Sequence, residues 1–350
     1  MSLGEQSMAG PGQRDLVIGN EFLGRRTPDE IRLAIEAYWR AVEKDPNYGL
    51  AYAKLAQAYA LALTYRYDLG MDGYQMAGLA EALATRGIEE APEDADAYAA
   101  RSYVRALSGA PTQLIAEDID RARNLEPNNP DIPSWSARIK ALEGDLEEAL
   151  EEAVRGAELD PLHSGRQIAV AFQAFHMGRH DMAVAYADAA LELEPNLMLP
   201  RVIKARSLVL LDRPAECLAM DLGPHEGTRA LCLWASGSRT EGEELAQALG
   251  LGFGAAPGEG FTPVLVAEDL AVFHAFTGNE AESLLWIQAA YAQSPTGVEL
   301  RVLQSGLFEG LRASQEFRRV TEEIRLGLYD RVRSSWGGDL DPYIQRETSG

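Results

Sequence analysis

The chain has 350 residues, 46% of them hydrophobic, so it can bury an apolar core and its composition is not that of a disordered protein. The formal net charge is −22, which argues against nucleic acid as a partner because nucleic-acid affinity depends largely on lysine and arginine neutralising phosphates. The charge also disfavours an anionic membrane surface, and no apolar run approaches the ~20 residues that a membrane span needs.

The N-terminal residues 1–14 lack the basic start and apolar stretch of a signal peptide. We interpret them as a tag or a disordered lead and expect the protein to be cytoplasmic. The two cysteines, Cys217 and Cys232, are too few for a disulfide scaffold, so we expect both to pack as small apolar groups.

A proline recurs in one sequence context through the first half of the chain, after segments with helical periodicity. It stands at Pro46, Pro92, Pro127, Pro161 and Pro195, so the later intervals are nearly equal and the first is the longest. The later intervals match the period of about 34 residues that is typical of tetratricopeptide helix-turn-helix repeats. Because proline cannot continue a helix, each of these prolines is expected to end the second helix of a repeat.

Small residues recur on one face of each predicted second helix. Before Pro195 they are Ala183, Ala187 and Ala190, at helical spacing. Small side chains let neighbouring helices approach to ~8–10 Å. Glycines such as Gly144 are expected at the turn between the two helices of a repeat. The complementary face of the first helix after Pro46 consists of Tyr52, Leu55, Ala56 and Tyr59.

The spacing also predicts the boundaries of the repeat region. The first interval is longer than one repeat, and we interpret the excess, within residues 61–76, as an extended helix or a loop that could form a contact. Repeats are clear from about residue 15 to 197 and degenerate from 198 to 262. A final repeat and a polar-faced cap are expected at 263–330, followed by a loose tail at 331–350.

These features predict an all-α fold, a right-handed superhelical solenoid of about seven helix-turn-helix repeats with a C-terminal capping helix. The chain resembles the tetratricopeptide repeat family over roughly residues 15–330. Phe22-Leu-Gly-Arg-Arg-Thr-Pro28 and Gly278-Asn-Glu-Ala-Glu-Ser-Leu-Leu-Trp286 are also similar to segments of bacterial signalling proteins. In those proteins the repeats lie C-terminal to adenylate cyclase, serine/threonine kinase or winged-helix regulator domains.

No catalytic, cofactor or metal motif accompanies the repeats. Gly250, Gly252 and Gly254 do not follow a strand, so they are not a dinucleotide-binding loop. His176 and His180 have the i, i+4 spacing of two metal ligands, but a glycine turn lies between them and we interpret both as exposed turn histidines. We therefore predict a protein that is not an enzyme and needs no cofactor.

In repeat arrays the first helices line the inner groove. By repeat spacing, the groove positions are Gln57, Tyr103, Arg138, Phe172 and Arg206, with Phe175 on the same face as Phe172. Aromatic and arginine side chains are typical interface anchors, and this set would suit a peptide with apolar side chains and a carboxylate. The alternative is that the two phenylalanines fill core between repeats.

The sequence thus favours a protein–protein interaction scaffold that binds a partner protein or peptide in its concave groove. The resemblance implies an alternative, a regulatory or sensor region of a bacterial signalling protein such as an adenylate cyclase, kinase or transcriptional regulator. A third hypothesis is a small-ligand sensor with a pocket near residues 250–261. A homodimer is compatible with each of these.

Overall fold

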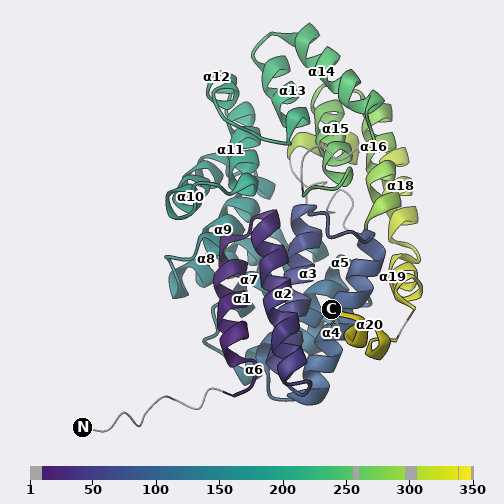
Figure 1. The fold of residues 1–350 in the computed structure, drawn as a ribbon. Helices are drawn as coiled ribbons and strands as arrows, with labels where there is room; N and C mark the ends of the chain where they lie inside the picture. Colours follow the sequence, from purple (N-terminus) through teal and green to yellow (C-terminus); the bar gives the residue numbers. More distant parts are fainter. Residues whose placement is uncertain (1–9, 255–259, 296–305, 338, 348–350) are drawn as a thin grey trace.

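The computed structural model describes residues 10–254, 260–295, 306–337 and 339–347. Within these ranges the chain forms eight antiparallel helix pairs that follow one another along a curved path (Figure 1). The pairs are α1 (Gln13–Arg25) with α2 (Pro28–Lys44), α3 (Gly49–Tyr65) with α4 (Gly73–Glu90), α5 (Ala95–Leu107) with α6 (Thr112–Leu125), α7 (Asp131–Glu143) with α8 (Leu146–Leu159), α9 (Ser164–His176) with α10 (His180–Leu193), α11 (Met198–Leu210) with α12 (Pro214–Leu218), α13 (Glu226–Ala235) with α14 (Arg239–Leu251), and α15 (Val264–Phe276) with α16 (Glu280–Gln293).

Local sequence signals set the ends of these helices. The turn glycine Gly144 has φ 96°, a left-handed conformation that glycine adopts without a Cβ penalty, and it ends α7 before α8 begins. At the start of α2, Thr27 accepts a hydrogen bond from the Glu30 amide, and Pro28 occupies the first helical position. The recurring prolines lie in the turns between pairs, as predicted from their spacing.

Alanines form the closest contacts between successive helices. Ala183, Ala187 and Ala190 of α10 are fully buried, and α10 packs on both α9 and α11. Small side chains let the helix backbones approach closely. Burying alanine also costs almost no side-chain conformational entropy. The predicted small-residue face is therefore confirmed in this repeat.

The excess residues of the first spacing lengthen α3 and α4 and form the connection between them, residues 66–72. The connection contacts the segment just before α15, since the Asp68 amide donates to the Gly260 carbonyl at 2.9 Å and the Thr262 amide to the Arg66 carbonyl at 2.8 Å. The sequence predicted a contact element here, and its partner is another part of the same chain.

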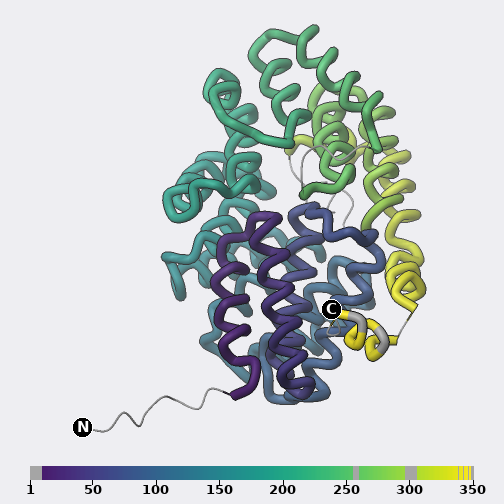
Figure 2. Tube along the Cα trace, viewed as in Figure 1, coloured from purple at the N-terminus to yellow at the C-terminus, as the bar shows by residue number. Residues whose placement is uncertain are grey.

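The solenoid curves until its last helices lie against its early ones, which closes the chain into a ring (Figures 1 and 2). Two further contacts join α4 to the C-terminal half. Tyr74 donates to the Tyr291 carbonyl at 2.6 Å, and the Tyr329 hydroxyl donates to a Glu81 carboxylate oxygen at 2.8 Å. An open solenoid has no such contacts, because each repeat touches only its neighbours.

The end of the chain is helical and packed. After η2 (Gly306–Phe308) and α17 (Glu309–Arg312), the cap α18 (Gln315–Arg325) buries Phe317 and Val320 and exposes its polar face. Two more helices follow, α19 (Leu328–Trp336) and α20 (Asp341–Glu347). The prediction of a loose tail at 331–350 is therefore wrong for residues 331–337 and 339–347, because Trp336, Tyr343 and Ile344 pack against the N-terminal core.

Two further sequence interpretations concern the lead and the cysteines. The predicted lead, residues 1–14, lies largely outside the described residues, and its last part belongs to α1. Cys217 and Cys232 are fully buried as expected but are not independent apolar groups, because a disulfide joins them across α12 and α13.

No helix in the described part of the chain is long and apolar enough to cross a membrane.

Substituting Gly78 with alanine should release the C-terminal helices from α4. A Cβ on Gly78 would overlap the Cβ of Trp336, so α19 could not keep its position. We expect faster amide hydrogen exchange across residues 328–336 and a lower melting temperature. Gly24→Ala is the matched control, because its Cβ meets no atom within 4 Å, and it should leave exchange unchanged. Equal exchange in both variants would contradict the packing of α19.

Candidate functional site

The six predicted groove residues lie on the first helices of five successive pairs, as repeat spacing required. They are Gln57 on α3, Tyr103 on α5, Arg138 on α7, Phe172 and Phe175 on α9, and Arg206 on α11. Five of the six are buried, and Phe172 is partly buried. The prediction of an open groove at these positions is therefore wrong, because ring closure and neighbouring repeats cover them.

Tyr103 and Arg138 belong to one buried polar network. The Tyr103 hydroxyl lies 2.7 Å from the Thr64 hydroxyl, and Arg138 Nη1 donates to the Tyr103 hydroxyl at 3.3 Å. Gln57 lies apart from them and accepts from Lys54 Nζ at 3.2 Å. Tyr103 and Arg138 satisfy buried hydrogen-bonding groups between repeats, and Gln57 bonds within its own helix, so all three have a structural role.

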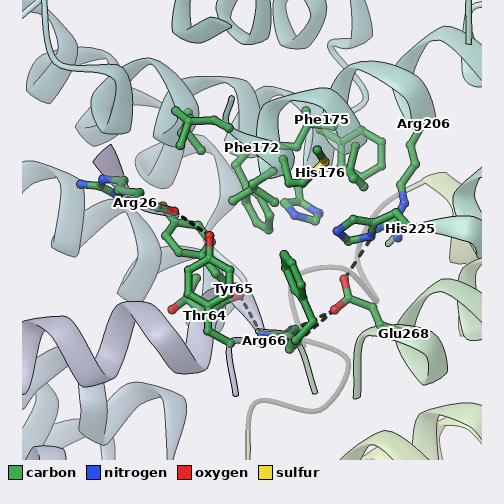
Figure 3. Close-up of a pocket in the computed structure, with 18 residues that line it drawn as sticks. Arg26, Thr64, Tyr65, Arg66, Phe172, Phe175, His176, Arg206, His225 and Glu268 are labelled. Atoms are coloured by element: carbon green, nitrogen blue, oxygen red, sulfur yellow. Dashed lines mark hydrogen bonds and ion pairs between the residues drawn. The ribbon is translucent and has the colours of Figure 1, made fainter. Parts of the chain in front are cut away.

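Phe172, Phe175 and Arg206 meet at a cavity inside the ring (Figure 3). We call it the central cavity, and its volume is about 50 Å³. Helices α3, α9 and α11 supply most of its wall, and Arg26, Phe261 and Glu268 come from other segments. The remaining lining residues are Thr64, Tyr65, Arg66, Tyr67, Ile168, His176, Leu197, Met198, Leu199, Val202, Ile203 and His225.

Buried ion pairs form one side of the central cavity. Arg66 Nη2 lies 3.0 Å from a Glu268 carboxylate oxygen, and Arg206 Nη1 lies 3.7 Å from the other. Arg206 also donates to Asp269 at 2.6 Å. Burial raises the pKa of Asp269, but His225, Arg206 and the Thr228 amide outweigh burial and hold that pKa below its usual range. Arg206 is thus committed to carboxylates of its own chain.

The prediction that both histidines are exposed is wrong, because His176 is buried and His180 is partly buried. Helix α9 ends at His176 and α10 begins at His180, so the turn was placed correctly. His176 is only 3% exposed, however, and lies on the wall of the central cavity rather than in solvent. Among the described residues, no group of three histidine, cysteine or acidic side chains could hold a metal ion.

Sequence reasoning missed most of the cavity, including Arg26, Arg66 and Glu268. A contact by Arg66 could have been predicted, because Arg66 lies in the excess residues that were expected to form a contact. Arg26 follows α1 with φ 58°, a left-handed conformation that is uncommon for a non-glycine residue, and no sequence pattern marks it.

A larger hollow lies between α5, α7 and α18, and we call it the α5–α18 groove. Its volume is about 960 Å³. Its floor is apolar, and arginines and glutamates line its rim. The buried floor residues are Leu107, Ile115, Ile139, Tyr291, Phe317 and Leu328, and the charged rim residues are Glu143, Arg312, Arg318, Glu322 and Arg325.

The helix pairs and the ring define the class of protein, an all-helical repeat solenoid. More narrowly, the proline spacing and the glycine turns between paired helices are those of a tetratricopeptide-repeat solenoid.

No family model matches the chain, and no curated protein matches it. Its structure is similar to a tetratricopeptide-repeat protein of Thermus thermophilus, with 20% identity, a TM-score of 0.44, and coverage of 57% of this chain and 99% of that one. It is also similar to yeast Tom70, with 16% identity, a TM-score of 0.48, and coverage of 93% of this chain and 69% of that one. Likeness at this level carries no argument about function.

Removing Asp269 should destabilise the protein through Arg206. The variant Asp269→Ala leaves a buried guanidinium short of its closest carboxylate, which typically costs about 3–5 kcal/mol of unfolding free energy. The double variant Arg206→Met/Asp269→Ala removes both charges and should lose less than the single variant. Urea unfolding measures both. A single variant within about 0.5 kcal/mol of wild type would contradict a buried ion pair.

Proposed function

We propose that the chain is a non-catalytic scaffold that binds a segment of a partner protein in the α5–α18 groove. The observation that carries this proposal is the combination of an apolar floor with a charged, open rim on the edge of the ring. Its volume is at the upper end of the range for ligand pockets, so an extended segment or one helical turn can enter.

The rim favours an acidic segment. Arg318 and Arg325 are exposed, and neither has an ion pair within the described part of the chain. Leu326 is 71% exposed beside them, and an exposed large apolar side chain next to a hollow is typical of a binding surface. A partner segment with Asp or Glu near an apolar anchor would pair with the arginines and fill the floor.

The alternative of a regulatory region is supported by a different observation. Contacts of segment 66–74 with residues from 260 onward hold the ring closed, and they include hydrogen bonds and an ion pair. A bound molecule that strengthens or weakens them would shift the ring between closed and open forms. A catalytic or DNA-binding domain joined to this chain could respond to that shift.

A peptide selection tests the groove directly. Peptides of about 12 residues selected from a random library on the intact protein should be enriched in Asp and Glu next to Leu or Phe. The double variant Arg318→Gln/Arg325→Gln should bind them at least about 10-fold more weakly, because it removes the rim charges.

The matched control is Arg155→Gln/Arg229→Gln, which makes the same charge change at exposed positions outside the groove. It should bind like wild type. Selected peptides that are basic, or that bind both double variants equally, would rule out the groove as the partner site.

A further inference from the structure

We propose that the central cavity binds a carboxylate on a small apolar group, with the carboxylate at Arg26 and the apolar part against Phe172. A water molecule needs about 10–15 Å³ of such volume, so a cavity of about 50 Å³ suits about three to five non-hydrogen atoms. Propionate and the C-terminal end of a peptide share this chemistry. The site is separate from the α5–α18 groove and does not rest on the function proposed above.

Charge is the first observation behind this assignment. The whole chain has a net charge of −22, yet the central cavity is lined by three arginines and one glutamate. Glu268 pairs with Arg66, and Arg206 pairs with Asp269. Arg26 is left over, because within the described residues it forms no ion pair with a carboxylate. The cavity therefore carries an excess positive charge that a bound anion would neutralise.

The placement of Arg26 is costly without an anion. Its guanidinium lies against Gly165 at the start of α9, where a Cβ would overlap it. The N-terminus of a helix carries a partial positive charge, so it repels a cation there. Arg26 also has φ 58° and ψ 26°, a left-handed conformation that costs energy for a non-glycine residue. Unfavourable conformations of this kind persist where surrounding structure or function requires them.

Within the described part of the chain, Arg26 keeps one side-chain hydrogen bond and has no carboxylate partner. Arg26 Nη1 donates to the Tyr65 hydroxyl at 2.9 Å, whereas Nε is buried and has no hydrogen-bond partner among the described residues. Nε, Cζ and Nη2 pack against Gly165, and Nε is covered. A carboxylate in the cavity would therefore pair with the charge of the guanidinium rather than with Nε itself.

Two neighbouring groups report the same positive surroundings. Burial raises the pKa of Tyr65, but Arg26 and Arg138 outweigh burial and hold it below its ordinary value. The pKa of His163 is lowered to about 4, by burial first and then by Arg26 and Arg166, so His163 is neutral at pH 7. His163, being neutral, does not compensate the charge of Arg26.

The rest of the cavity wall is apolar. Phe172 is partly buried there, and Ile168, Leu197 and Ile203 are buried around it. These side chains offer no hydrogen bonds, so they suit a methyl or short alkyl group rather than the oxygens of phosphate. A carboxylate with one apolar end matches both sides of the cavity shown in Figure 3.

Titration calorimetry of the intact protein in acetate-free buffer tests the proposal. Propionate and butyrate should bind with a Kd between about 10 µM and 1 mM, the range open to so small a ligand. Propionamide has nearly the same shape without the charge and should not bind, and inorganic phosphate should bind at least about 10-fold more weakly. A peptide ending in valine, with a free or an amidated C-terminus, shows whether the carboxylate can belong to a peptide.

Two variants and one control connect binding to Arg26. Arg26→Gln removes the charge, and Gly165→Ala keeps the charge but displaces the guanidinium, so each should weaken propionate binding at least about 10-fold. Arg25→Gln is the control, because Arg25 is exposed, pairs with Glu30 and does not line the cavity. Circular dichroism melting of each variant identifies any variant that fails to fold. The binding measured on the other, folded variant then tests the role of Arg26.

The site is supported if propionate, or only the peptide with a free C-terminus, binds wild type. Both folded variants must then lose this binding, and Arg25→Gln must retain it. The proposal is overturned if no carboxylate binds wild type, if propionamide or phosphate binds as well as propionate, or if Arg26→Gln binds like wild type.

Discussion

Contacts of residues 66–81 with residues from 260 onward close the ring. The Arg66–Glu268 ion pair and the Tyr74–Tyr291 hydrogen bond join segments that lie far apart in the sequence. Arg66 and Tyr74 are buried and Glu268 is partly buried, so each would lose hydration without its partner. The central cavity and the burial of the inner helices both follow from this closure.

Closure changes what the inner face can do. In an open solenoid the first helices present their side chains to a partner, but here Arg206 and Phe175 are buried against the chain itself. The inner face therefore offers the small central cavity rather than an open groove at these positions. We therefore propose that a larger partner binds at the edge of the ring, where the α5–α18 groove is open.

The sequence predicted the parts of the fold that are local and periodic. Proline spacing placed the helix pairs, and the alanines at 183, 187 and 190 identified the faces that pack closely. It did not predict closure, because no periodic pattern encodes a contact between Arg66 and Glu268. The packing of Trp336 on α4 was missed for a related reason, since its partner Gly78 belongs to an early repeat, far from it in the sequence.

For the candidate site too, the sequence predicted local placement but not long-range contacts. Repeat spacing put Phe172, Phe175 and Arg206 on first helices, where they line the central cavity, but their exposure depends on distant segments. Arg26 was missed because its role comes from the left-handed backbone and from Gly165 on another repeat.

Small-angle X-ray scattering of the purified chain tests ring closure most directly. A closed ring of this length should have a radius of gyration near about 20–22 Å, the value expected for a compact chain of 350 residues. A clearly larger radius with the scattering profile of an elongated particle would show an open solenoid and contradict this account.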